Sequence, residues 1–188
     1  MRILMGSLLA LACSISQIGT AGCKYTVDPQ GTELSWTGYK TPKKVGVSGT
    51  FKKIELSGGE TADTMVAALK GLSYKIDVGT TSSGDTVRDT RIAKILLLGT
   101  DSISGTYLDS TKDIVNFDIN INGKSQKIAV KFKEDQDKLV GEGTFDLAKF
   151  ALDKNIAAFA EACKGRHEGK TWTDVLAKLT LKFKKQCS

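Results

Sequence analysis

Histidine and proline are scarce in this sequence, with one histidine and two prolines among 188 residues, and only 7% of the residues are aromatic. A single imidazole excludes any mechanism that needs two, and most metal sites with it. The remaining composition, 40% hydrophobic and 26% charged, lies near the average of globular proteins. It excludes wholesale disorder, collagen and coiled coil, and the length suits about one domain.

Catalytic motifs are also missing. No GxSxG is present, and the segment 165–171 has three residues between its glycines where a phosphate-binding loop needs four. Cys163 and His167 are four residues apart, but no second histidine or CxxC pair completes a metal shell. We therefore expect a protein that is not an enzyme, with no catalytic residue, no metal and no cofactor of its own.

The N-terminus is typical of a secretory signal peptide. Arg2 precedes a mostly apolar, uncharged run over residues 3–15, and Gly19-Thr20-Ala21 supplies small residues for a cut after Ala21. A retained membrane anchor would need about 20 apolar residues. We expect residues 1–21 to be the signal peptide and residues 22–188 to be one periplasmic or secreted domain. A lipoprotein cut before Cys23, or before Cys13, is the alternative.

The positive charge has a simple interpretation. The net charge is +6 and the isoelectric point is near 9.1, but the lysines are scattered singly along alternating segments. No run of lysines alternates with aromatic residues. Behind a signal peptide, a solvated surface explains this charge better than a nucleic-acid partner does.

Strict alternation of apolar and polar residues dominates the chain after residue 22, and it predicts strands with one dry face. Eight such segments occur, at residues 34–36, 45–51, 72–78, 103–107, 115–121, 128–132, 139–145 and 179–183. Asn122-Gly123 predicts a two-residue hairpin between the fifth and sixth. Antiparallel strands of this kind bury their dry faces in a sandwich or a closed barrel, and closure also removes exposed edges. We expect a mainly β fold, an antiparallel eight-stranded barrel.

Helical spacing interrupts the strands over residues 64–69, 88–97 and 150–162. Asp89 or Thr90 could cap the second helix. Such helices plug a barrel end or line its mouth. On the seventh strand Gly141 and Gly143 face inward, where they either leave space for a small ligand or relieve crowding at a bend.

Several short motifs resemble those of the YceI-like proteins when taken in order. They are YTVDP at 25–29, LSW at 34–36, VSGTF at 47–51, YKIDV at 74–78, Arg88-Asp89, GTFDL at 143–147 and WTDV at 172–175. The resemblance implies a lipocalin-like barrel, periplasmic or secreted, that holds a long isoprenoid or other lipid chain. A histidine after the first long strand and a Tyr-Pro element after the Arg-Asp helix are missing, so the cargo can differ from a quinone or polyprenol.

The leading hypothesis is therefore a carrier or sequestering protein for a long-chain amphiphile such as an isoprenoid, a quinone, or a fatty acid or amide. Its partners would be this apolar ligand and, peripherally, a membrane surface. The ligand-binding residues we expect are Trp36, Phe51, Tyr74, Ile76, Ile92, Phe117, Ile119, Val130, Phe145 and Phe159. Tyr74 could offer a polar tip. The alternative is a secreted interaction or adhesion module whose barrel is filled by its own side chains.

Two pairings remain to be decided. Arg88 and Asp89 either form an ion pair that pins the helix or contact a ligand head group. In a closed barrel the first and last strands are neighbours, which predicts a disulfide between Cys23 and Cys187. The rival pairing joins Cys163 to Cys187.

Overall fold

The structure is a computed structural model that describes residues 22–188. The predicted signal peptide at residues 1–21, and Cys13 within it, lie outside the described residues. Among those described, no helix has the length and apolar character needed to span a bilayer.

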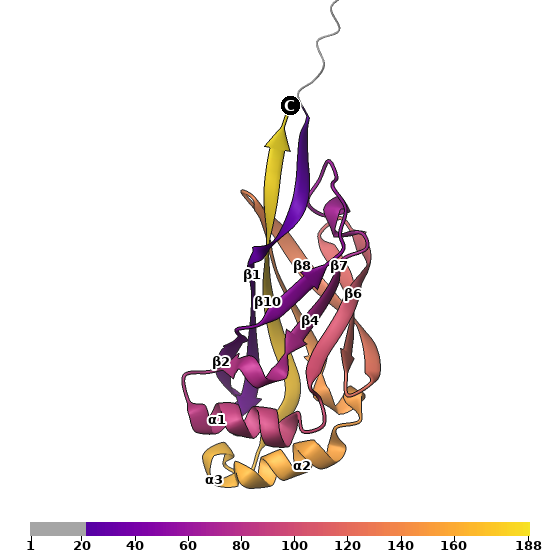
Figure 1. Ribbon diagram of the computed structural model, residues 1–188. Coiled ribbons are helices and arrows are strands. Elements are labelled where there is room, and N and C mark those ends of the chain that lie inside the picture. Colours follow the sequence, from indigo (N-terminus) through magenta and orange to yellow (C-terminus); the bar gives the residue numbers. More distant parts are fainter. Residues whose placement is uncertain (1–21) are drawn as a thin grey trace, which may run out of the picture.

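One curled antiparallel sheet makes up most of the described chain, in the order β3-β4-β6-β7-β8-β9-β10-β1-β2-β5. Figure 1 shows it curling on itself, with most of the helical segments gathered at one end. Its ten strands are β1 (Cys23–Lys40), β2 (Val45–Phe51), β3 (Ile54–Ser57), β4 (Ser73–Asp77), β5 (Thr81–Ser82), β6 (Ser102–Thr111), β7 (Ile114–Ile121), β8 (Lys124–Asp135), β9 (Lys138–Asp146) and β10 (Thr171–Cys187). The predicted mainly β, antiparallel barrel fold is confirmed.

The strand count differs from eight because the second predicted strand continues beyond a bend. Only Lys52 and Lys53 separate β2, which pairs with β1, from β3, which pairs with β4. At the bend the Lys52 amide donates to the Thr80 carbonyl at 3.2 Å. The two lysines interrupt the apolar alternation, so the sequence pattern stops at Phe51. The bent segment joins the two sides of the curled sheet, and the two-residue β5 is the other addition.

The helices are short. They are η1 (Ala67–Leu69), η2 (Val78–Thr80), α1 (Thr86–Arg91), η3 (Ile92–Leu96), η4 (Leu147–Phe150), α2 (Asp153–Ala162) and α3 (Lys164–His167). Those near residues 64–69, 88–97 and 150–162 lie where helical spacing predicts them, whereas η2 and α3 were not predicted. The expected caps Asp89 and Thr90 are wrong, because α1 begins earlier and the Asp85 carboxylate accepts the Arg88 amide at 3.0 Å. The segment 150–162 is split at Ala151, which has a φ of 54°.

The core lies between the inward faces of the central strands. On β7, Val115, Phe117, Ile119 and Ile121 are all buried. At its end, Asn122 and Gly123 have φ values of 53° and 71°, the left-handed conformation at both positions that a tight hairpin turn needs. The predicted hairpin is confirmed, and it sets the register by which β8 adds its own apolar face to the core.

A disulfide joins Cys23 and Cys187 where β1 and β10 end together. Figure 1 shows this paired end projecting away from the helices. Cys163 is a buried free thiol at the helix end, so the rival pairing of Cys163 with Cys187 is wrong. The Cys23 sulfur is already bonded, which leaves it no thiol for lipid attachment.

Candidate functional site

A deep cavity of about 100 Å³ lies among the inward faces of the strands. Its lining is apolar apart from Thr32, the Tyr74 hydroxyl and the Trp36 indole N–H. Five residues predicted to bind the ligand line this cavity and not the outer one: Tyr74, Ile76, Phe117, Ile119 and Val130. Neither an acidic nor a basic side chain lines it.

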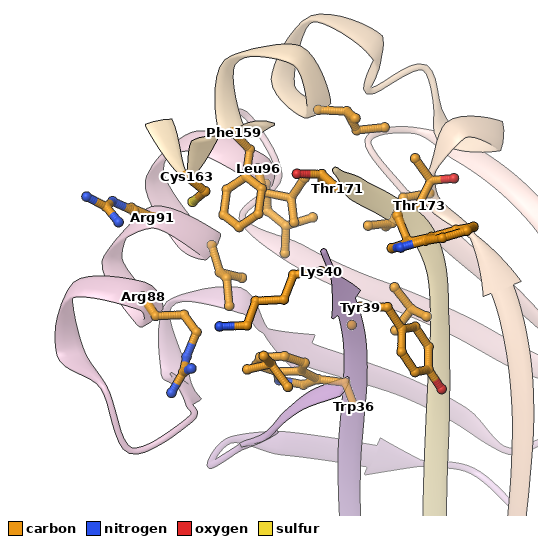
Figure 2. Close-up of a pocket in the computed structure, with 18 of the residues that line it drawn as sticks. Trp36, Tyr39, Lys40, Arg88, Arg91, Leu96, Phe159, Cys163, Thr171 and Thr173 are labelled. Carbon is orange, nitrogen blue, oxygen red and sulfur yellow. The ribbon is translucent and has the colours of Figure 1, made fainter. Parts of the chain in front are cut away.

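An outer cavity of about 170 Å³ lies at the helix end of the barrel. Figure 2 shows the helical segments lying over it, with Phe159 and Leu96 directed toward its centre. Ile92 from η3 and Phe159 from α2 were predicted as ligand contacts, and both line it. The helices therefore form a partial lid in which a stripe of apolar residues faces the cavity.

The two cavities meet at shared walls. Trp36, Phe51, Ile103 and Phe145 line both of them. The two cavities are therefore adjacent, one at the helix end and one deeper in the barrel, and we refer to the pair as the channel. All ten residues predicted to bind the ligand lie along this channel, although their contact with a ligand stays a prediction.

Gly141 and Gly143 face inward as predicted, but they provide no ligand space. A Cβ at Gly141 would lie 2.5 Å from the Phe132 ring and 2.8 Å from the Lys131 carbonyl oxygen. At Gly143 it would lie 2.7 Å from the Ala129 carbonyl oxygen. Neither glycine lines a cavity. Both relieve crowding where neighbouring strands approach closely, and the space-making interpretation is wrong.

The Tyr74 hydroxyl, expected to offer a polar tip to a ligand, already has a partner within the protein. Its Oη donates to the Asp118 carbonyl oxygen at 2.8 Å. Burial, with a smaller effect of the Asp118 carboxylate, raises the pKa of Tyr74 far above its usual value, so the phenol stays protonated. A hydrogen-bond donor without a partner is provided instead by Trp36, whose Nε1 is buried and unpaired and whose side chain lines both cavities.

Arg88 and Asp89 meet on a third residue instead of pairing with each other. Arg88 Nε donates to Ser83 Oγ at 2.7 Å, and Asp89 Oδ1 accepts the Ser83 amide at 2.9 Å. Both side chains thus hold the segment before α1. The direct ion pair predicted between them is replaced by this shared serine, and the pair pins the start of the lid.

The mouth of the channel also carries polar residues that the sequence analysis did not propose as ligand contacts. Lys40, Arg91, Arg166 and His167 line the outer cavity together with Arg88. They come from three elements: Lys40 from β1, Arg88 and Arg91 from α1, and Arg166 and His167 from α3. No sequence spacing links them, because only the fold brings these elements together.

His167 packs edge-on against Phe159, with ring centroids 5.9 Å apart, and its Nδ1 lies 2.7 Å from Thr171 Oγ1. Burial, followed by repulsion from Lys40 and Arg91, lowers the pKa of His167 below its usual value of 6.5. The imidazole is therefore neutral at pH 7. Cys163 lies close by as a buried residue of the same lining.

Comparison with known proteins places this geometry in context. The family model of the YceI-like domain matches residues 25–182. A polyisoprenoid-binding domain from Saccharophagus degradans, implicated in plant cell wall breakdown, has a similar structure with a TM-score of 0.59 at 14% identity, covering 86% of this chain and 98% of its own. BcnA from Burkholderia cenocepacia has a TM-score of 0.56 at 16% identity, covering 82% of this chain and 98% of its own. No curated protein sequence matches the chain.

Proposed function

The chain belongs to the YceI-like family, and from this premise we propose that it is a secreted or periplasmic carrier, or sequestering protein, for an amphiphile with one long apolar chain. The tail would lie along the channel, with its far end in the deep cavity. The head would remain at the helix end. Catalysis has no part in this proposal.

The observation that carries the proposal is the pair of adjacent, largely apolar cavities along the barrel. At about 3.3 Å per residue, the eight residues of β7 span a length that suits an extended acyl or isoprenoid chain. Each buried methylene contributes about 0.8 kcal/mol. A tail can therefore bind without convergent polar groups, in agreement with the almost wholly apolar lining.

Two further features support the proposal. The structural relative from Saccharophagus degradans is described as a polyisoprenoid-binding domain. The disulfide between Cys23 and Cys187 suits an oxidising compartment outside the cytoplasm, where the predicted signal peptide would deliver the chain.

The test combines extraction with a binding measurement. Protein purified from the periplasm or medium is extracted with organic solvent, and the extract is analysed by mass spectrometry. Binding of N-phenyl-1-naphthylamine, a neutral apolar fluorophore, is then titrated. We expect a stoichiometric lipid in the extract and saturable fluorophore binding once the lipid is removed.

A matched pair of variants ties binding to the channel. Val130 lines the deep cavity, and its neighbour Lys131 on β8 faces solvent. Val130→Trp should fill the cavity and abolish fluorophore binding, whereas Lys131→Trp should leave it unchanged. Circular dichroism establishes that both variants are folded. An empty extract together with no saturable binding would overturn the proposal and favour a barrel that serves as an interaction module.

A further inference from the structure

The charged side chains that line the channel all carry the same sign. Among residues 22–188, the lysine and arginine residues in the lining are Lys40, Arg88, Arg91 and Arg166, and no aspartate or glutamate lines either cavity. All four lie in the outer cavity. The channel thus combines an apolar interior with a basic mouth.

Two of these cations have no anionic partner among the described residues. Lys40, at the end of β1, is half-buried, and Arg91, at the end of α1, is also half-buried. Neither forms an ion pair or a side-chain hydrogen bond within residues 22–188. Figure 2 shows the Lys40 amine directed toward the side of the pocket where Arg88 and Arg91 lie.

The acidic residues near the mouth are engaged with other groups. Asp85 pairs with Arg166 at 3.6 Å. Asp89 accepts hydrogen bonds from Ser83, and Glu161 on α2 pairs with Lys164 at 3.6 Å. No carboxylate therefore compensates Lys40 or Arg91, whose positive potential adds up beside an apolar surface.

Lys40, Arg91 and His167 line the same outer cavity. Lys40 from β1 and Arg91 from α1 both disfavour protonation of His167 on α3. Three elements thus present positive or protonatable groups to one small region. Partly burying such groups without counter-charges is costly, and a bound anion would offset that cost.

We propose, on the basis of the carrier function above, that the cargo is an anionic amphiphile whose carboxylate or phosphate head is held by Lys40 and Arg91. The tail passes Trp36 into the deep cavity. Arg88 and Arg166 already have protein partners and add long-range attraction. An uncharged alcohol or quinone could accept a hydrogen bond there but would leave the two positive charges uncompensated, so it gains less at the mouth than an anion does.

The experiment compares three ligands with the same twelve-carbon tail by displacement of N-phenyl-1-naphthylamine from delipidated protein. These are dodecanol, dodecanoate and dodecyl phosphate, at pH 8, where the imidazole is neutral and both acids are ionised. Inorganic phosphate and acetate serve as tail-free anions. We expect one or both anionic ligands to displace the fluorophore at about tenfold lower concentration than dodecanol does. The stronger of the two identifies the head group as carboxylate or phosphate.

Variants then assign the preference to the mouth. Lys40→Gln and Arg91→Gln should each weaken the anionic ligands several-fold, and together they should erase the difference from dodecanol. The affinities for dodecanol and the fluorophore should change much less than those for the anionic ligands. Lys94→Gln is the matched control, since Lys94 is an exposed residue of η3 that does not line the channel.

The outcomes separate the two proposals. If dodecanol and the fluorophore bind wild-type protein but the anions bind no better, or if the double variant keeps their advantage, the head-group site is wrong and the carrier function stands. If the fluorophore and all three twelve-carbon ligands fail to bind, the carrier function itself fails, and the head-group site with it. Displacement by inorganic phosphate alone would also contradict the site, because it would show an anion site independent of the tail.

Discussion

Removing the disulfide should cost much of the stability of this protein. The perturbation is the double variant Cys23→Ser/Cys187→Ser, which leaves no unpaired thiol at either position. The two cysteines are 164 residues apart in sequence. The ends of β1 and β10 around them are mostly exposed, at residues 23–26 and 184–187. The variant thus removes little core packing, and the bridge acts mainly by restricting the unfolded chain.

The magnitude follows from the length of the closed loop. In the chain-entropy relation, a loop of this length contributes about 5 kcal/mol at 25 °C. Residual structure in the unfolded chain reduces this value, so we expect a loss of about 3–5 kcal/mol. The total stability of a domain is typically about 5–15 kcal/mol. The variant should therefore unfold at a much lower urea concentration.

Urea unfolding followed by tryptophan fluorescence measures this loss, with Trp36 and Trp172 as reporters. Wild-type protein in the presence of a reductant should match the double variant. Cys163→Ala, which changes the free thiol, should keep the full contribution of the bridge. Peptide mapping without reduction must first show Cys23 linked to Cys187. The loop length predicts a difference of about 5 kcal/mol between bridged wild-type protein and the double variant. A measured difference below about 1 kcal/mol would refute the reasoning.

Three further predictions test the packing and the electrostatics. Gly141→Ala should destabilise the fold by about 1–3 kcal/mol, because its Cβ would meet Phe132 and a carbonyl oxygen. Gly165→Ala is the control and should not destabilise the fold, since a Cβ there has nothing within 4 Å. Equal urea midpoints for the two variants would contradict this prediction. The pKa of His167, measured from its NMR signal, should lie below 6.5 and rise in Lys40→Gln. An unchanged pKa in this variant would show that Lys40 does not act on His167. Since the folded pKa of His167 is the lower one, its contribution to stability is present above pH 6.5 and is lost as the pH falls through the folded value, so His167→Gln should lessen the loss of thermal stability on acidification. Hydrogen bonds from the Thr173 hydroxyl and the Ala148 amide lower the pKa of Asp146. Asp146→Asn should therefore be less stable at pH 7, and its stability should fall less than that of wild-type protein as the pH drops below 3.8. Urea unfolding at pH 7 and below pH 3.8 measures both effects.

The sequence by itself determined the strands and the apolar face of each. Alternation with period two is local, so the inward positions on β7 and β8 can be identified without knowing what they face. The bridge from Cys23 to Cys187 was also predictable, since closure of the sheet makes its first and last strands neighbours. The bend at Lys52-Lys53 could not be predicted, because two charged residues within a continuing strand give the same sequence pattern as the end of a strand.

Only the tertiary structure decided whether inward glycines leave space and where charge gathers. Gly141 is covered by Phe132 from the adjacent strand, and the registry that places the ring there depends on the whole β8–β9 pairing. Lys40 and Arg91 are 51 positions apart in the numbering, and they line one mouth only because the fold places α1 at the end of the barrel where β1 ends. Periodicity reports which face of an element is buried. It carries no information about which elements meet, and the cationic mouth is a property of that meeting.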